Sequence, residues 1–187
     1  MKRIALLGWL LCLGLPAAAL EVNGVKLDDT RQVAGQSLVL NGAGVRTKWF
    51  FKVYVGALYL TTRQSSADMV IADEHPLRIE LHLLRELSGK KLYGAFNEAI
   101  QANHDGRELS AMHDALRQMA AIFDAVGKTQ KGDVVALDYQ PGTGTQVVVN
   151  GKVYGVIAGA QFKRALLKIW LGGKPAQEDL KKAMLGG

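Results

Sequence analysis

Arg46 is the first residue whose type and position indicate binding chemistry. It follows the glycine-rich segment 41–44 and precedes an apolar segment that runs from Trp49 to Thr61. A guanidinium group in this position either lies at the rim of a sheet in water or points into a cleft, where its planar fork of donors binds an anion. Position alone favours the rim, and both interpretations stay open at this point.

Lys52 and Tyr54 are the polar exceptions on one face of that apolar segment. Residues two apart in a strand share a face, so the two side chains lie side by side. Tyr54 either donates a hydrogen bond in a cleft or is a core tyrosine whose hydroxyl finds a partner. Asn103 closes an apolar helical stripe that also contains Phe96, and it is either a helix-end residue or a donor in the cleft.

Several kinds of reaction chemistry have no motif in this sequence. There is no Gly-x-Ser-x-Gly elbow, no His-Glu-x-x-His helix and no phosphate-binding loop. The four histidines do not form a compact set of metal ligands, and His75 and His82 lie near one predicted strand without partners. We therefore expect no metal and no cofactor.

Strands are predicted in antiparallel groups. Asn23-Gly24 is the strongest two-residue turn signal and predicts a hairpin over 21–27. A short strand over 37–40 is followed by a predicted loop over 41–44. The segment Trp49–Thr61 is apolar on both faces, which predicts a central strand that is covered on both sides.

Helices and further strands follow. A short helix is predicted over 65–72, a strand over 76–84, and a helix from the capping residue Ser88 to Asn103. Asp105 and Glu108 resemble a capping box that opens the next helix. Its apolar stripe faces the core by default, with a ligand-lining role for its two methionines as the alternative; it consists of Leu109, Met112, Leu116, Met119, Phe123 and Val126.

The C-terminal third contains a predicted meander and two helices. Strands over 133–139, 145–149 and 152–157 are joined by turns at Pro141-Gly142 and Asn150-Gly151. Helices over 160–171 and 176–185 follow. Antiparallel groups of strands with clustered helices predict an α+β domain whose helices pack mainly on one face of a sheet.

The N-terminus has the pattern of a secretory signal peptide. Lys2 and Arg3 precede an apolar run from residue 4 to 15, and Ala17-Ala18-Ala19 supplies the small residues that a signal peptidase needs. We expect cleavage after Ala19, export to the periplasm or beyond, and one domain over 20–187; an uncleaved anchor is the alternative. The only cysteine, Cys12, lies in the removed segment.

The charge pattern excludes some partners. The formal net charge of +6 falls to +4 on cleavage, because the segment carries Lys2 and Arg3 and no acidic residue. The remaining basic residues are scattered among acidic ones, with neither a basic stripe nor a stacking platform, so we expect no nucleic-acid partner. No segment after the signal peptide is predicted to span a membrane, and a weak attraction to anionic lipid stays open.

Three segments together resemble the chalcone isomerase-like superfamily, in its bacterial exported branch. They are Leu40-Asn-Gly-Ala-Gly-Val-Arg46 with the strand 49–60, the helix 96–103, and the run from Phe162 to Gly172 with Pro175. The resemblance covers residues 21–186. It implies an open-faced β-sandwich, in which a large antiparallel sheet carries a helical layer on one face and a ligand cleft lies between them.

The resemblance also implies which residues line that cleft. Arg46 matches the arginine that handles the substrate's oxyanion in the family's enzymes, and Asn103 matches a cleft-helix asparagine. Tyr54 stands where those enzymes carry a threonine, Phe96 where they carry a tyrosine, and Ala99 where they carry a lysine. We therefore expect the ligand-binding set Arg46, Lys52, Tyr54, Phe96 and Asn103, and no catalytic residue.

The functions that follow belong to three classes. Phe96 and Ala99 cannot transfer a proton, whereas Arg46 with Tyr54 suits a carboxylate, as in the family's fatty-acid-binding members. The leading expectation is a periplasmic, non-catalytic binding protein for a small amphipathic acid, with a fatty acid first. The alternatives are an isomerase or intramolecular lyase that uses Arg46 as electrophile, and a partner-binding or assembly protein with a vestigial cleft.

Overall fold

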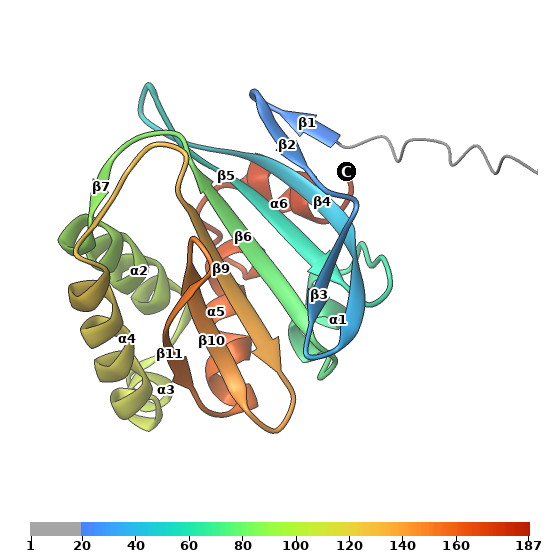
Figure 1. Ribbon diagram of the computed structural model, residues 1–187. Helices are drawn as coiled ribbons and strands as arrows, with labels where there is room; N and C mark the ends of the chain where they lie inside the picture. The colour runs from blue at the N-terminus through green and yellow to red at the C-terminus, as the bar shows by residue number, and fades with distance from the viewer. Residues whose placement is uncertain (1–19) are drawn as a thin grey trace, which may run out of the picture.

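A computed structural model describes residues 20–187 of the protein, so the predicted signal peptide and its cleavage site lie outside the described residues. A curled antiparallel sheet of seven strands forms the centre of the fold (Figure 1). Across the sheet the strands are β11 (Lys152–Ile157), β10 (Gly144–Val149), β9 (Val134–Gln140), β6 (Leu77–Leu83), β5 (Phe51–Leu60), β4 (Gln36–Lys48) and β3 (Thr30–Val33). Two short antiparallel pairs lie beside it: β1 (Leu20–Val22) with β2 (Val25–Leu27), and β7 (Leu87–Ser88) with β8 (Lys128–Thr129).

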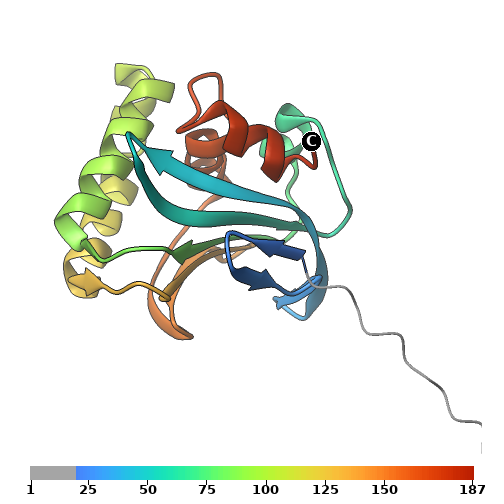
Figure 2. The same ribbon diagram turned by 90° about the horizontal axis from the view of Figure 1, so that it is seen from above.

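The helices cover one face of this sheet. The main layer consists of α2 (Gly89–Asn103), α4 (His113–Val126) and α5 (Ala160–Leu171), which share one large apolar core with the sheet. The shorter helices are α1 (Ala67–Ala72), α3 (Gly106–Ala111) and α6 (Glu178–Met184). In Figure 2 the β1–β2 hairpin and α6 lie on opposite sides of the central strands. The predicted α+β fold, with a large antiparallel sheet and helices on one face, is confirmed.

Tight turns join the strands where the sequence predicts them. Asn23-Gly24 and Asn150-Gly151 both take positive φ at the two turn positions, as a type I′ turn requires. A third turn of this kind joins β3 to β4 at Ala34-Gly35, with φ of 51° and 75°. The alanine gives no such signal in the sequence, and this hairpin was not predicted.

Residues 41–44 are strand and not the predicted loop. They form the middle of β4, where the register with β5 shifts between Leu40 and Gly42. A Cβ atom at Gly42 would lie 2.1 Å from the Ala183 carbonyl oxygen, and one at Gly44 would lie 2.8 Å from the Ala183 Cβ. Glycine is therefore needed at both positions because α6 lies directly against β4. Glycine in a strand can mark such a close approach as well as a turn.

Strand β5 is covered on both faces, as its composition predicts. Leu58 and Leu60 belong to the core beneath the helices, whereas Val55 and Tyr59 belong to a second, smaller core on the opposite face. The strand begins at Phe51 rather than at Trp49, because Trp49 and Phe50 form the turn between β4 and β5.

Side chains set the helix starts. The Ser88 hydroxyl accepts a hydrogen bond from the Lys91 backbone N–H at the start of α2. At the start of α3, the Asp105 carboxylate accepts from the Glu108 backbone while the Glu108 carboxylate accepts from the Asp105 backbone, which confirms the capping box. The predicted single helix after Asp105 is divided at Met112 into α3 and α4.

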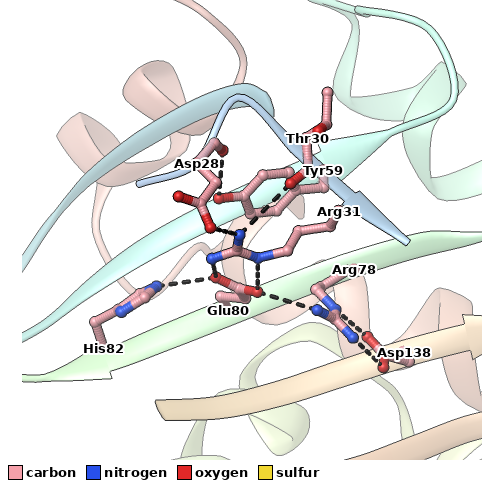
Figure 3. Close-up of polar contacts among 8 residues, drawn as sticks. All are labelled: Asp28, Thr30, Arg31, Tyr59, Arg78, Glu80, His82 and Asp138. Carbon is pink, nitrogen blue, oxygen red and sulfur yellow. Dashed lines mark hydrogen bonds and ion pairs between the residues drawn. The ribbon is translucent and has the colours of Figure 1, made fainter. Parts of the chain in front are cut away.

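A buried ion network occupies the sheet face opposite the helices (Figure 3). The curl of the sheet brings Arg31 on β3 to Glu80 on β6, with Nε–Oε1 at 2.6 Å. Arg78 forms a bidentate pair with Asp138 at 2.5 and 2.7 Å, and His82 Nε2 lies 3.0 Å from Glu80 Oε2.

Both histidines that were expected to lack partners have them. His82 contacts Glu80 within this network, and His75 Nδ1 lies 2.5 Å from Asp73 Oδ1. The sequence offered a signal for the first pairing, because Glu80 and His82 are two positions apart in the predicted strand over 76–84 and so lie on the same face.

Candidate functional site

A cleft of about 340 Å³ lies between the sheet and the helices. This volume is at the lower end of the range for small-molecule sites. The sheet contributes Val53, Leu81, Val135, Leu137, Val147 and Val149, and the helices contribute mainly Leu92, Ala95, Phe96, Ala99, Ala102, Met119, Ile122, Phe123, Val126, Leu166, Ile169 and Trp170. Almost the whole wall is hydrocarbon, so the interior suits an apolar chain.

Small residues on α2 keep this space open. Ala95, Ala99 and Ala102 lie three or four positions apart, so they lie on one side of the helix and all line the cleft. Phe96 is buried beside them and packs against Phe123 of α4, with ring centroids 5.6 Å apart. The three alanine side chains are thus too short to fill the space between α2 and the sheet.

Polar side chains gather where the cleft opens to solvent. Arg46, Lys48, Glu98 and Lys174 all line this end. Lys48 and Glu98 form an exposed ion pair at 3.6 Å, which links the β4–β5 hairpin to α2. Three cations and one carboxylate make this mouth a place where an anion is favoured.

Arg46 and Tyr54 meet at the mouth because of strand register. They are direct partners across the β4–β5 ladder, and both line the cleft. Directly opposed residues in antiparallel strands have Cβ atoms about 4.5–5.5 Å apart. The hairpin alone therefore places a guanidinium group next to a phenol.

Gln177 holds Arg46 in position. Its Oε1 accepts hydrogen bonds from the Thr47 backbone N–H at 2.8 Å and from Arg46 Nη1 at 3.3 Å, and its Nε2 donates to the Val45 carbonyl at 3.4 Å. Arg46 Nη1 also donates to the Thr47 carbonyl. Within residues 20–187, Nε and Nη2 of Arg46 donate to no protein acceptor, so two nitrogen atoms with three N–H groups remain for a ligand.

Tyr54 is a neutral donor held by Trp170. The Trp170 indole Nε1 donates to the Tyr54 hydroxyl at 2.9 Å. Burial raises the pKa of Tyr54 above its ordinary value of 10.0, although the Trp170 hydrogen bond and the charge of Arg46 act in the opposite direction. The phenol therefore keeps its proton at neutral pH, and no acceptor in the described part of the chain receives it.

Two of the five expected ligand-binding residues lie outside the cleft wall. Lys52 is exposed and its Nζ donates to Asn23 Oδ1 at 2.5 Å, toward the β1–β2 hairpin. Asn103 binds the loop after α5: its Nδ2 donates to the Lys174 carbonyl at 2.8 Å and its Oδ1 accepts from the Lys174 N–H at 3.1 Å. The loop that Asn103 holds in place lines the cleft, but the Asn103 side chain itself does not.

Arg46, Tyr54 and Phe96 are the three expected residues that the cleft brings together. Sequence reasoning missed the roles of Trp170 and Gln177, which come from α5 and the residue before α6. An indole N–H on the buried stripe of α5 was the available signal, since a buried indole needs an acceptor. Of the two methionines considered as ligand-lining, Met119 lines the cleft and Met112 is buried in the core.

Neither a metal site nor a membrane span is found in residues 20–187. No group of three or more His, Cys, Asp or Glu residues there is arranged to hold a metal ion. No helix in the same part of the chain has the length and apolar character to cross a bilayer.

Comparisons with known proteins agree with this architecture. A family model described as chalcone isomerase-like matches residues 19–186. A solved structure of a fatty-acid-binding protein from Arabidopsis thaliana aligns with a TM-score of 0.68, at 18% sequence identity, over 87% of this chain and 92% of that one. At this identity the likeness shows a shared fold. No curated protein sequence matches the chain.

Proposed function

This chain belongs to the chalcone isomerase-like family, and we propose that it is a non-catalytic binding protein for a fatty acid or a similar amphipathic carboxylate. The observation that carries the proposal is the pairing of Arg46 and Tyr54 at the open end of an apolar cleft. The carboxylate lies at the mouth and the hydrocarbon chain lies between the sheet and the helices.

The donors at the mouth match a carboxylate. Arg46 has three N–H groups left on Nε and Nη2, because Nη1 donates to Gln177 and to the Thr47 carbonyl. A guanidinium fork binds the two oxygens of a carboxylate in parallel. The Tyr54 hydroxyl adds a further donor. A related fold in Arabidopsis thaliana belongs to a fatty-acid-binding protein, which supports the same ligand class here.

The cleft wall matches an apolar chain. Each methylene group buried there contributes about 0.8 kcal/mol, so affinity should rise about fourfold per added carbon until the cleft is full. Beyond that length affinity should level off.

Titration of the purified protein with saturated fatty acids of increasing length tests the proposal. Arg46→Ala should weaken binding about tenfold to a hundredfold, since a charge-assisted contact contributes about 1.5–3 kcal/mol. Lys52→Ala removes a positive charge at the same end of the sheet, outside the cleft, and should bind as the wild type does. Equal affinities for wild type and the folded Arg46→Ala variant would remove Arg46 from the site.

A second candidate is an isomerase or intramolecular lyase. The neutral Tyr54 hydroxyl beside Arg46 favours it, because this pair suits a developing oxyanion. Against it, Phe96 and Ala99 line the cleft where the family's enzymes carry a tyrosine and a lysine, and neither transfers a proton. A saturable loss of chalcone absorbance that disappears in Arg46→Ala would favour this candidate; a rate equal to buffer supports the binding protein.

We also propose that the protein works in the periplasm after removal of residues 1–19. The support is the sequence pattern around Ala17-Ala18-Ala19. N-terminal sequencing of protein recovered from the periplasm should return Leu20, and a Met1 terminus would contradict the proposal.

A further inference from the structure

The turn between β4 and β5 exposes three consecutive aromatic side chains. Trp49, Phe50 and Phe51 are 82%, 93% and 58% exposed. Within residues 20–187 every exposed Trp, Phe or Tyr ring lies at these three positions. Neither core nor cleft uses these rings, so their position is unexplained by the fold or by the proposed ligand.

The backbone of this turn also departs from its easiest conformation. Trp49 takes φ of 61°, in the left-handed region that favours glycine. The residue there is nevertheless the largest side chain available. Strain of this kind in an exposed aromatic turn points to a role for the side chain itself.

The charge around the three rings is positive on balance, with Glu98 paired to Lys48 at 3.6 Å. Lys48 and Lys52 flank them in sequence, and the Arg85 guanidinium lies over the Phe51 ring, 4.6 Å from its centre. No acidic residue occurs between Arg46 and Lys52. Exposed Trp and Phe surrounded by Lys and Arg have the composition of segments that enter the interface of an anionic bilayer.

We propose that this tip, residues 48–52, docks on an anionic membrane surface. The aromatic rings enter the boundary between headgroups and acyl chains, and the two lysines contact lipid phosphates. Arg46 and Lys48 also line the mouth of the cleft, so docking turns that mouth toward the bilayer. The docking is inferred from the tip alone. In this orientation a fatty acid would pass between the bilayer and the cleft, and this second step rests also on the proposed function.

Vesicle binding tests the docking. The purified protein is mixed with vesicles of phosphatidylcholine alone or with phosphatidylglycerol, and all variants are compared in the same processed form. The tip variant is Trp49→Ser with Phe50→Ser. The matched control is Val153→Ser with Val156→Ser, which removes two exposed apolar side chains from β11, 49% and 40% exposed.

Wild type and control should bind the anionic vesicles, and the tip variant should bind at least tenfold more weakly, because two aromatic side chains no longer leave water. Lys48→Gln with Lys52→Gln should reduce binding to anionic vesicles and leave the weaker binding to neutral ones unchanged. Equal binding of wild type and tip variant, or equal binding to both kinds of vesicle, would overturn the proposal.

The fluorescence of Trp49 shows whether this side chain enters the bilayer. Its emission is obtained by subtracting the spectrum of Trp49→Phe, because Trp9, where retained, and the buried Trp170 are common to both proteins. It should shift to shorter wavelength with anionic vesicles and be quenched by lipids brominated on the acyl chain. An unshifted spectrum would place Trp49 outside the bilayer and contradict insertion.

Two further measurements separate membrane docking from ligand binding and from self-association. The variant Trp49→Ser with Phe50→Ser changes no residue of the cleft wall and should bind fatty acid normally in the absence of vesicles. A failed docking test therefore leaves the proposed function standing, and a failed titration leaves the docking standing. If analytical ultracentrifugation showed a dimer that the tip variant dissolves, with no binding to vesicles, the tip would be a contact between two copies and the membrane proposal would be wrong.

Discussion

Tyr54 accepts a hydrogen bond from Trp170, which leaves its own proton free for an anion in the cleft. Because burial keeps the phenol neutral, it does not repel the carboxylate proposed to bind beside Arg46. The indole contributes indirectly, since it fixes the oxygen from which the proton is donated. One hydrogen bond thereby links the packing of α5 to the chemistry of the mouth.

The variant Tyr54→Phe removes both contacts at once. Affinity for a fatty acid should fall about tenfold, and the free energy of unfolding should fall by about 1–3 kcal/mol because the buried Trp170 N–H loses its acceptor. Adding Trp170→Phe should restore much of that stability and leave the affinity low. Fatty-acid titration and urea unfolding of the two variants measure this, and unchanged affinity in Tyr54→Phe would exclude the phenol from the site.

Part of this site follows from the sequence alone. Arg46 and Tyr54 are found because strand parity and a resemblance to a known family place them in a cleft. Trp170 and Gln177 are not, because they reach the site from segments more than 100 positions away, and only tertiary packing sets such contacts. Lys52 was expected beside Tyr54, but the register with β4 shifts between Arg46 and Thr47 and its side chain extends toward Asn23.

The contact between β4 and α6 is the element on which the position of Arg46 depends. Gly44 lets α6 approach, and the approach brings Gln177 to the exposed edge of β4. Glycines in a segment such as 41–44 predict a loop when neighbours are ignored, and here they permit close packing. Local sequence cannot separate these meanings, since the partner helix lies about 140 residues later.

Gly44→Val tests that dependence. A Cβ atom at this position lies 2.8 Å from the Ala183 Cβ, so the free energy of unfolding should fall by about 1–3 kcal/mol as α6 is displaced. Fatty-acid affinity should fall too, because Gln177 moves with α6. Gly94→Ala is the matched control: space is open at this mid-helix position, and the change should stabilise α2 by up to about 1 kcal/mol. Normal affinity in a folded Gly44→Val protein would show that α6 does not position Arg46.

At the scale of the whole molecule, the ion network holds the curled sheet together on the face away from the cleft. Burial alone would raise the pKa of Glu80, but hydrogen bonds from His82 and Arg31 and their charges outweigh it and lower the pKa to about 2. The Glu80 side chain is 3% exposed, so solvent screens these contacts little. The order of elements predicted the sheet and its helical layer, whereas the curl that joins β3 to β6 leaves no local signal.

Stability should depend on pH through Glu80. Its ordinary pKa is 4.5 and its folded value is about 2, so the ionised carboxylate stabilises the fold above pH 4.5, and this contribution is lost as pH falls through about 2. Glu80→Gln should cost about 3–5 kcal/mol at pH 7, because Arg31 and Arg78 lose a buried partner. Urea unfolding from pH 7 to 2 should show a smaller pH dependence for the variant; curves parallel to the wild type would contradict the assignment.

The alternation along β6 and β9 has a practical consequence for protein engineering. Leu81, Val135 and Leu137 line the cleft, whereas Glu80 and its ionic partners project from the other side. The shape of the cleft and the stability of the sheet therefore depend on different residues, which alternate along the same strands. Libraries that randomise only the inward set can change the shape of the cleft and leave the ion network on the other face intact.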